Sequence, residues 1–346
     1  MDEFRGSQRI RQEIFPYFPP KMQAAFEKLP DALVERLEEL RMRAGQPFLC
    51  CAGEKEYGFD SLEGWTTEWK QVMTLSGEEV RQTFLAVSEH SRYAFDEDIR
   101  RGFLTLPGGH RVGISGQVLP EGMQVRSITA VGGLAFRVAR ACAGCADAVL
   151  PKLLEKDGVL PNVLIVSPPR CGKTTLLRDL CRQLSNGSDY AEGKAVTIVD
   201  ERSEIAGCFA GIPQLDVGLR TDVLDGCPKA EGMMMALRAL SPEVIVTDEI
   251  SRPEDAAGVR ECVFSGISVL TSVHAGSLEE AKSRPGIREL LEEGVFGKIV
   301  VLSRRDGPGK IERIETLHPG GKPDAGGGEY GKWNMHGESV CSGRSV

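Results

Sequence analysis

Short apolar runs alternate with helix-like segments through the second half of the chain. Six of these runs are rich in β-branched residues, as buried strands are: residues 163–166, 196–199, 244–247, 268–273, 298–301 and 311–314. Between the runs, apolar positions recur at the spacing of one helix face, and helices are predicted from Leu176 to Leu184, over 231–240 and 253–264, and from Ser277. This alternation predicts an α/β domain, which we place at residues 159–318.

Helices are also predicted in the first part of the chain. Apolar residues from Leu33 to Leu40 lie at helical spacing and predict a surface helix over residues 31–41. Ser76 and Glu79 have the spacing of a capping box, so a second helix is expected to begin there. Neither pattern resembles the strand and helix alternation of the second half.

Glycine-rich segments of alternating polarity follow these helices and predict strands within residues 102–116, 125–128 and 134–138. The sequence Pro107-Gly108-Gly109 predicts a hairpin turn. We therefore expect a smaller α+β domain at residues 1–145 and a linker at 146–158, with a hinge near Ala141 to Asp157. The tail, residues 319–346, is rich in glycine and has no periodic apolar pattern, which predicts disorder.

Composition narrows the possible functions. A length of 346 residues is enough for about two domains. The net charge of −8 argues against broad electrostatic binding of nucleic acid, so no nucleic-acid partner is expected. No apolar stretch is long enough to span a bilayer and the N-terminus lacks a signal-peptide core, which predicts a cytoplasmic protein. Among ten cysteines, Cys142 and Cys145 form the one Cys-x-x-Cys pair, either a zinc or redox site or incidental core residues.

The strand at 163–166 leads into a candidate phosphate-binding loop. The loop matches the pattern Gly-x-x-x-x-Gly-Lys-Ser/Thr except at its first position, which is serine. Strand, loop and helix in this order direct backbone N–H groups and a helix N-terminus at one point, where an anion is favoured. The predicted nucleotide-binding residues are Ser167, Pro168, Pro169, Arg170, Cys171, Gly172, Lys173, Thr174 and Thr175. Lys173 is expected to reach the β- and γ-phosphates, and Thr174 to ligate Mg²⁺.

Three other apolar strands end in acidic residues or a histidine. Ligands of an open α/β sheet bind at the carboxyl ends of its strands, where the loop also lies. Asp248 is predicted to hold Mg²⁺ through water, and Glu249 to activate the attacking water. Glu201, together with Asp200, is the alternative for that role. His274 is expected to sense the γ-phosphate, although a lone histidine is more often an ordinary core or surface group.

Several arginines are candidates for a phosphate contact from a neighbouring subunit, because the guanidinium fork matches phosphate oxygens. We favour Arg137 and Arg140, which lie among the predicted strands of the first domain. The alternative is that they are solvated residues on a strand face. Arg220 and Arg238 are further candidates, which could instead cap helices or form surface ion pairs.

Taken together, these motifs resemble the secretion ATPases of type II and type IV systems, which are RecA-like, AAA-type P-loop NTPases. Residues 199–204 resemble the aspartate box of that group, and residues 271–276 resemble its histidine box. A closer resemblance, from about Leu33 to Ile314, is to the family of stage III sporulation protein AA. It rests on three segments: residues 102–116, 167–179 and 218–235.

The resemblance implies a RecA-like P-loop core with a smaller N-terminal α+β domain. It also implies a Mg²⁺-dependent ATPase that forms a homo-oligomer, expected to be a hexameric ring, in the mother-cell cytoplasm of an endospore-forming bacterium. The ring would lie peripherally at a membrane and energise membrane-embedded channel proteins between mother cell and forespore. Two alternatives stay open: a nucleotide-gated scaffold with little need for hydrolysis, and a RecA-like nucleic-acid motor, which the acidic balance disfavours.

Overall fold

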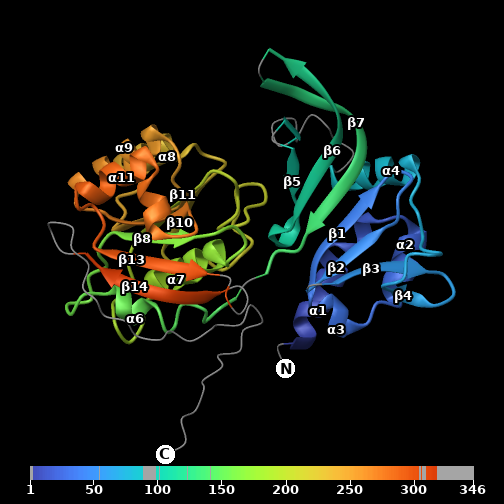
Figure 1. The fold of residues 1–346 in the computed structure, drawn as a ribbon, viewed down its shortest axis with the longest axis horizontal. Coiled ribbons are helices and arrows are strands. Elements are labelled where there is room, and N and C mark those ends of the chain that lie inside the picture. The colour runs from blue at the N-terminus through green and yellow to red at the C-terminus, as the bar shows by residue number, and fades with distance from the viewer. Residues whose placement is uncertain are drawn as a thin grey trace, which may run out of the picture. The chain divides into compact units, whose positions relative to one another are not determined.

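The computed structural model describes residues 3–317, except residues 54, 89–98, 101, 123, 141, 304 and 306–308. The predicted tail therefore lies outside the described residues. The chain divides into two compact units, Met1–Arg140 and Ala141–Val346. Among the residues described, each unit has a seven-stranded sheet and a hydrophobic core of its own (Figure 1).

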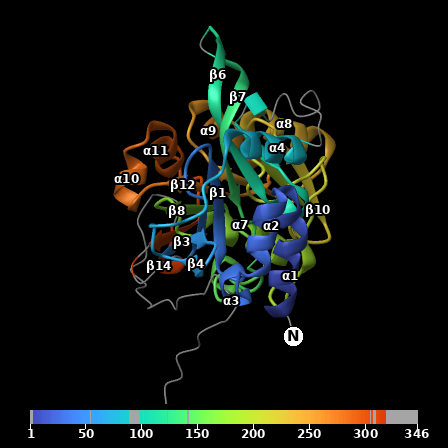
Figure 2. The ribbon, with the colours of Figure 1, turned by 90° about the vertical axis from the view of Figure 1, so that its right-hand side faces the viewer.

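The first unit is built on an antiparallel sheet with the strand order β4-β3-β2-β1-β7-β6-β5. The strands are β1 (Leu37–Arg43), β2 (Leu49–Ala52), β3 (Lys55–Asp60), β4 (Gly64–Thr66), β5 (Phe103–Thr105), β6 (Arg111–Glu121) and β7 (Gln124–Arg137). The helices are α1 (Glu3–Glu13), η1 (Phe15–Tyr17), α2 (Pro20–Glu27), α3 (Asp31–Val34), α4 (Gly77–Val87) and η2 (Pro107–Gly109). Helices α1, α2 and α4 pack against this sheet (Figure 2), and their buried side chains share one core with those of β1 and β7.

The predicted helix over residues 31–41 is wrong beyond its first turn. Helix α3 ends at Val34, and Leu37 begins strand β1. The register against β2 shifts between Leu37 and Glu39. This bulge adds a residue between two buried positions, so Leu37 and Leu40 both face the core at a spacing of three, which imitates a helix.

Other predictions for the first unit are confirmed. The Ser76 hydroxyl oxygen accepts a hydrogen bond from the backbone N–H of Glu79, and the Glu79 carboxylate accepts one from the backbone N–H of Ser76, as in a capping box. The turn at Pro107–Gly109 joins β5 and β6, and Gly108 and Gly109 have positive φ angles. Beyond the sheet, β6 and β7 continue as a two-stranded ribbon (Figure 1).

The second unit has the strand order β10-β9-β11-β12-β8-β13-β14, parallel except for β14. The strands are β8 (Val163–Ser167), β9 (Val196–Asp200), β10 (Thr221–Asp225), β11 (Val244–Glu249), β12 (Ser268–His274), β13 (Lys298–Ser303) and β14 (Lys310–Thr316). The helices are α6 (Leu150–Leu153), α7 (Lys173–Asn186), α8 (Lys229–Ala239), α9 (Pro253–Phe264), α10 (Leu278–Lys282) and α11 (Pro285–Glu292). The predicted α/β class is confirmed.

Alternate residues of the buried strands face opposite layers. Val163 and Ile165 pack in a core with α6 and α7, whereas Leu164 and Val166 pack with α8 to α11. A parallel sheet covered by helices on both faces needs apolar side chains on both, which explains its continuous apolar runs. The expected linker, residues 146–158, contributes Ala146 and the α6 side chains to the first of these cores.

Candidate functional site

A tight loop joins β8 to α7 and carries the predicted phosphate-binding residues. Arg170 and Gly172 in this loop have φ angles of 60° and 85°, and Gly172 is the N-cap of α7. These left-handed conformations reverse the chain between the end of the strand and the start of the helix. Successive N–H groups in such a turn, followed by a helix N-terminus, form an anion-binding concavity.

Position 167 does not require glycine, although the general pattern has glycine there. Ser167 is the last residue of β8 and is fully buried. Its hydroxyl donates a hydrogen bond to the carbonyl oxygen of Pro168, 2.8 Å away. Because any residue can adopt the extended conformation of a strand, the departure from the pattern at Ser167 causes no backbone strain.

The other loop residues differ in exposure. Pro169 and Arg170 are exposed, and Cys171 is buried with its thiol 3.7 Å from the carbonyl oxygen of Pro169. Thr174 and Thr175 in the first turn of α7 are half-buried. A ligand at the loop therefore meets backbone groups and threonine hydroxyls, while Cys171 supports the loop from inside.

Lys173 is buried at the start of α7, with 8% of its surface exposed. Burial lowers the pKa of its ammonium group, and the carboxylates of Glu249 and Asp248 oppose that shift. The Nζ atom lies 3.4 Å from Nε2 of His274. The ammonium is thus directed toward the strand ends instead of toward solvent.

His274 connects the loop with the acidic end of β11. Strand β12 lies between β8 and β11, and His274 is paired in register with Ser167. The Nε2 atom of His274 is 3.4 Å from an oxygen of Glu249, and its Nδ1 atom is 3.3 Å from the carbonyl oxygen of Ser167. The second oxygen of Glu249 is 3.9 Å from Nη1 of Arg284. The structure therefore brings together three predicted residues, Lys173, His274 and Glu249.

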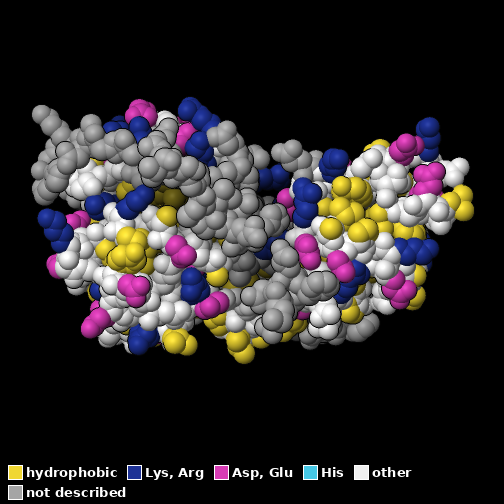
Figure 3. All heavy atoms as spheres, turned by 90° about the horizontal axis from the view of Figure 1, so that it is seen from below, with side chains coloured by type: hydrophobic (Ala, Val, Ile, Leu, Met, Phe, Trp, Pro, Cys, Tyr) yellow, Lys and Arg dark blue, Asp and Glu magenta, His cyan; other side chains and the backbone are white. Residues whose placement is uncertain are grey.

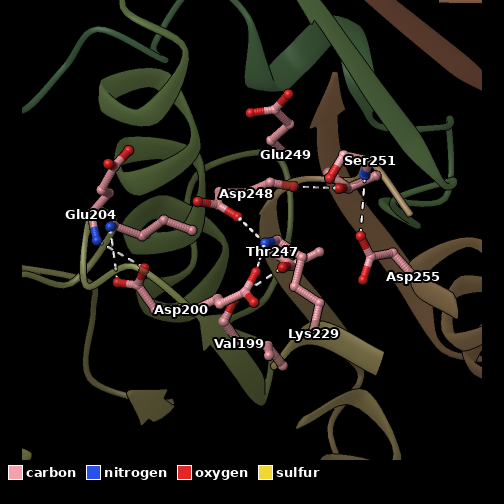
Figure 4. A network of polar contacts seen from close by, with 12 residues as sticks. Val199, Asp200, Glu204, Lys229, Thr247, Asp248, Glu249, Ser251 and Asp255 are labelled. Carbon is pink, nitrogen blue, oxygen red and sulfur yellow. Dashed lines mark hydrogen bonds and ion pairs between the residues drawn. The ribbon is translucent and has the colours of Figure 1, made fainter. Parts of the chain in front are cut away.

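Asp248 and Glu201 are brought together by a lysine that the sequence analysis missed. Lys229 donates a hydrogen bond to the Glu201 carboxylate. Figure 4 shows its second contact, in which the Nζ atom is 3.1 Å from Oδ1 of Asp248. Burial raises the pKa of Asp248, and Lys229 opposes the rise. For Glu201 the effect of burial is outweighed by the hydrogen bond and charge of Lys229, so its pKa is lowered.

Asp200 holds the backbone of the loop that follows β9. Its two carboxylate oxygens accept hydrogen bonds from the N–H groups of Glu204, Ile205 and Ala206 at 2.8–2.9 Å (Figure 4). The side chain is fully buried, and burial raises its pKa to about 6. With its lone pairs directed at these donors, Asp200 is placed to shape the loop and not to contact a reacting water.

The two favoured arginines differ in what they contact. Two carbonyl oxygens, those of Val34 and Leu37, accept hydrogen bonds from Arg140 at 3.0 and 2.9 Å. Arg137 is largely exposed, with Glu39 at 3.5 Å. Of the further candidates, Arg220 donates to the Ser185 carbonyl at the end of α7, 2.9 Å away, and Arg238 is exposed in the last turn of α8. Arg137 is therefore the better placed of the two to contact another molecule.

The residues at the strand ends fit a hard divalent cation. Oδ1 of Asp248 is buried and, within the described part of the chain, accepts no hydrogen bond of good geometry despite its ion pair with Lys229. Thr174 supplies a hydroxyl in the first turn of α7. Carboxylate and hydroxyl oxygens together with water are the ligands that Mg²⁺ prefers. The described residues contain no cluster of three or more His, Cys, Asp or Glu that would hold a metal without a further ligand.

Cys142 and Cys145 are buried in the core beside α7. The Cys145 thiol is 3.6 Å from the carbonyl oxygen of Thr175. Both cysteines are free thiols, and a hydrogen bond with Cys142 together with burial raises the pKa of Cys145, which makes the reactive thiolate scarce. This environment favours the interpretation of incidental core residues.

Residues 10–318 match the protein family described as sporulation stage III, protein AA. The chain belongs to this family. A relative from Bacillus subtilis (strain 168), named stage III sporulation protein AA, is 39% identical over 303 residues, which cover 87% of this chain and 94% of that protein. The resemblance proposed from the sequence motifs is confirmed.

The fold of the chain is similar to the folds of two solved proteins, an ATPase and a pilus retraction motor. The ATPase DotB of Legionella pneumophila superposes with a TM-score of 0.54 at 14% identity, over 82% of this chain and 76% of that chain. The pilus retraction motor PilT, solved with bound ADP, superposes with a TM-score of 0.52 at 14% identity, over 84% and 77%. The predicted RecA-like core with an N-terminal domain is confirmed.

Proposed function

We propose that the chain is a Mg²⁺-dependent ATPase that converts ATP to ADP and phosphate. The observation that carries the proposal is the meeting of the phosphate loop, His274 and the Asp248-Glu249 pair at the ends of three adjacent strands, β8, β12 and β11. Phosphoryl transfer depends mainly on positioning and on stabilising charge, and the site provides a buried lysine, a hydroxyl and two carboxylates for both. The ADP bound to PilT, which shares the fold, agrees with a nucleotide ligand.

Each residue has a distinct role in this proposal. The loop N–H groups and Lys173 bind the phosphates. Thr174 and Asp248 would hold Mg²⁺, Asp248 through water, and the ion would supply positive charge that stabilises the phosphates. Glu249 accepts a proton from the attacking water, and His274 contacts the γ-phosphate from its place between Lys173 and Glu249. Glu201 is less suited to act as the base, because its carboxylate is paired with Lys229.

Metal removal tests the reaction directly. We expect the purified chain to release phosphate from ATP in the presence of Mg²⁺, and we expect EDTA to lower the rate by at least about tenfold, since a metal ion contributes several kcal/mol to charge stabilisation. Adding back excess Mg²⁺, but not Ca²⁺ alone, should restore turnover, because Mg²⁺ demands the smaller octahedral geometry. A rate that EDTA leaves unchanged would contradict metal dependence. The absence of any phosphate release would contradict the proposal that the chain is an ATPase.

We further propose that hydrolysis energises a membrane-embedded channel complex between mother cell and forespore. Membership of the sporulation family supports the setting, and the likeness in fold to DotB and PilT agrees with a motor. Among the described residues, no helix is both long and apolar enough to cross a membrane. From the family setting, we propose that the ATPase lies in the mother-cell cytoplasm, held peripherally at the membrane by its channel partners. Co-purification of these membrane proteins with the tagged chain from sporulating cells would test this, and their absence would reject it.

Nucleic acid is not part of the proposed function. The net charge is −8, and on the face seen in Figure 3 lysine and arginine side chains are interspersed with acidic ones. A nucleic-acid motor needs a continuous positive track along the phosphate backbone. Stimulation of turnover by single-stranded DNA or RNA would contradict this view.

A homo-hexameric ring, with Arg137 reaching the nucleotide of a neighbouring subunit, is our proposal for the assembly. Exposure of the Arg137 side chain leaves it able to contact a phosphate, and a charge-assisted contact contributes about 1.5–3 kcal/mol. We expect Arg137→Ala to lower turnover by about 10- to 100-fold while ATP still binds. Arg41→Ala is the matched control, because Arg41 lies on the adjacent strand and also pairs with Glu39.

Two measurements check the assembly. Sedimentation with ATP should give a hexamer. Mixing Arg137→Ala subunits with Lys173→Ala subunits should restore part of the turnover, because the first variant supplies an intact Lys173 and the second an intact Arg137. A monomer at every protein and ATP concentration, or mixtures no more active than either variant alone, would refute a site shared between subunits.

A further inference from the structure

Lys229 occupies an unusual place for a lysine. It is the first residue of α8, and only 4% of its surface is exposed. The N-terminus of a helix carries partial positive charge, so a cation there is disfavoured. Burying an ammonium group adds a desolvation cost. Both costs must be offset by the two carboxylates that Lys229 contacts.

Close packing of α8 on β9 creates this contact. A Cβ atom placed on Gly232 would lie 2.4 Å from the side chain of Val199, so only glycine lets the helix approach the strand this closely. Lys229 precedes Gly232 by about one turn and is thereby carried to the end of β9. A hydrogen bond of 3.0 Å from Thr247 to the carbonyl oxygen of Val199 joins β9 to β11 just before their acidic residues.

The ammonium group lies between carboxylates that come from these two strand ends. Lys229 contacts Glu201, which follows β9. It also contacts Asp248 in β11 (Figure 4). Glu249 points away from this network and toward His274 instead. Lys229 thus holds two acidic residues of the site, Glu201 and Asp248, whereas Glu249 is paired with His274 instead.

From this arrangement we infer that Lys229 is a positioning residue, whose ammonium group fixes the Asp248 carboxylate in place and withholds Glu201 from the reacting water. The inference deepens the proposed function and depends on it. Lys229 acts through Asp248 and Glu201 and does not touch the phosphate loop. Its removal should therefore disturb the position of these two carboxylates and lower the rate of hydrolysis, and leave nucleotide binding largely intact.

The test compares Lys229→Met, which removes the charge at similar volume, with Lys229→Arg, which keeps it. We expect Lys229→Met to lower kcat at least tenfold with KM for ATP changed less than about threefold, and Lys229→Arg to recover a large part of kcat. The affinity for ADP with Mn²⁺, measured by Mn²⁺ EPR, should stay within about threefold of wild type. Lys194→Met is the matched control, because Lys194 pairs with Glu243 beside the opposite ends of the same two strands, β9 and β11.

Glu201→Gln keeps the inference testable if Lys229→Met does not fold. Lys229 then still holds Asp248, so Glu201→Gln should lower kcat less than Lys229→Met does. If Lys229→Met does not fold, the expectation is that kcat of Glu201→Gln stays within about tenfold of wild type. In the double variant, the loss should not exceed that of Lys229→Met alone, because both changes act on one contact.

Several outcomes would overturn the inference. They are an unchanged kcat in Lys229→Met, equal losses in kcat and nucleotide affinity, a Lys229→Arg variant no better than Lys229→Met, or a Glu201→Gln variant that loses all turnover. Wild-type protein that neither binds ADP with Mn²⁺ nor hydrolyses ATP would overturn the proposed function itself. Wild-type turnover together with any of the first four results would overturn the role of Lys229 alone.

Discussion

A Glu249→Gln variant is expected to bind ATP and to hydrolyse it about 10²- to 10⁴-fold more slowly than wild type, the usual range for loss of a general base. Glutamine keeps the size and hydrogen-bonding capacity of glutamate but cannot accept the proton of the attacking water. Glu249 is the partly exposed carboxylate beside His274, with 20% of its side chain accessible, whereas Asp248 is buried against Lys229. ATP affinity should persist because the phosphate loop is untouched.

Single-turnover hydrolysis and equilibrium ATP binding measure the two halves of this prediction. Glu254→Gln provides a matched control, since Glu254 is an exposed glutamate in the first turn of α9. Equal turnover in Glu249→Gln and wild type would remove Glu249 as the base and return Glu201 to consideration. Loss of ATP binding in Glu249→Gln would instead indicate that the substitution disturbs the loop.

The same variant separates a motor from a nucleotide-gated scaffold. In a sporulating host that lacks its own copy, a motor requires turnover, so Glu249→Gln should fail to support spore formation. A scaffold requires only bound ATP, and would work with Glu249→Gln but not with Lys173→Ala. Normal spore counts with Glu249→Gln would therefore favour the scaffold.

Much of the second unit was predictable because its strands are buried on both faces. A continuous apolar run leaves few alternatives to a central strand, and β8, β9, β11 and β12 coincide with such runs within one or two residues. Their shared direction then places whatever follows each strand at the same edge. That rule alone predicts that Lys173, Glu249 and His274 lie near one another.

The failures of sequence interpretation have local physical causes. Strand β10 was missed because it lies at the edge of the sheet, where residues Thr221 to Asp225 include only two apolar side chains and are only partly buried. The bulge in β1 turned a strand into an apparent helix. Lys229 was missed because its partners are 28 and 19 residues away in the chain, and its meeting with Glu201 depends on the close approach that Gly232 permits. The one available signal was a lysine directly after Pro228, at the positive end of a predicted helix.

Replacing Lys173 by alanine should weaken ATP binding by about 10²- to 10⁴-fold. Each hydrogen bond to a charged group contributes roughly 1.5–3 kcal/mol, and one ammonium group that reaches two phosphates makes two such contacts. Lys173 is buried, and its Nζ atom lies 3.4 Å from Nε2 of His274. A lysine on the surface cannot reach this position, so the lost charge is not replaced. Removal of Lys173 also takes away one of the positive charges near Glu249 and Asp248.

This substitution differs from Glu249→Gln in the step that it removes. Lys173→Ala should lose binding of ADP and ATP alike, with turnover falling as a consequence, whereas Glu249→Gln should lose turnover alone. Isothermal titration with ADP tests this without any reaction, and Lys152→Ala, a lysine in α6 remote from the loop in sequence, is the control. Because α7 begins at Lys173 and alanine favours helices, the fold should survive, and the thermal midpoint without nucleotide should stay within a few degrees of wild type. Lys173→Ala that still binds ADP as tightly as wild type would refute the loop at Ser167 to Thr174 as the phosphate site, and with it the mechanism built on that loop.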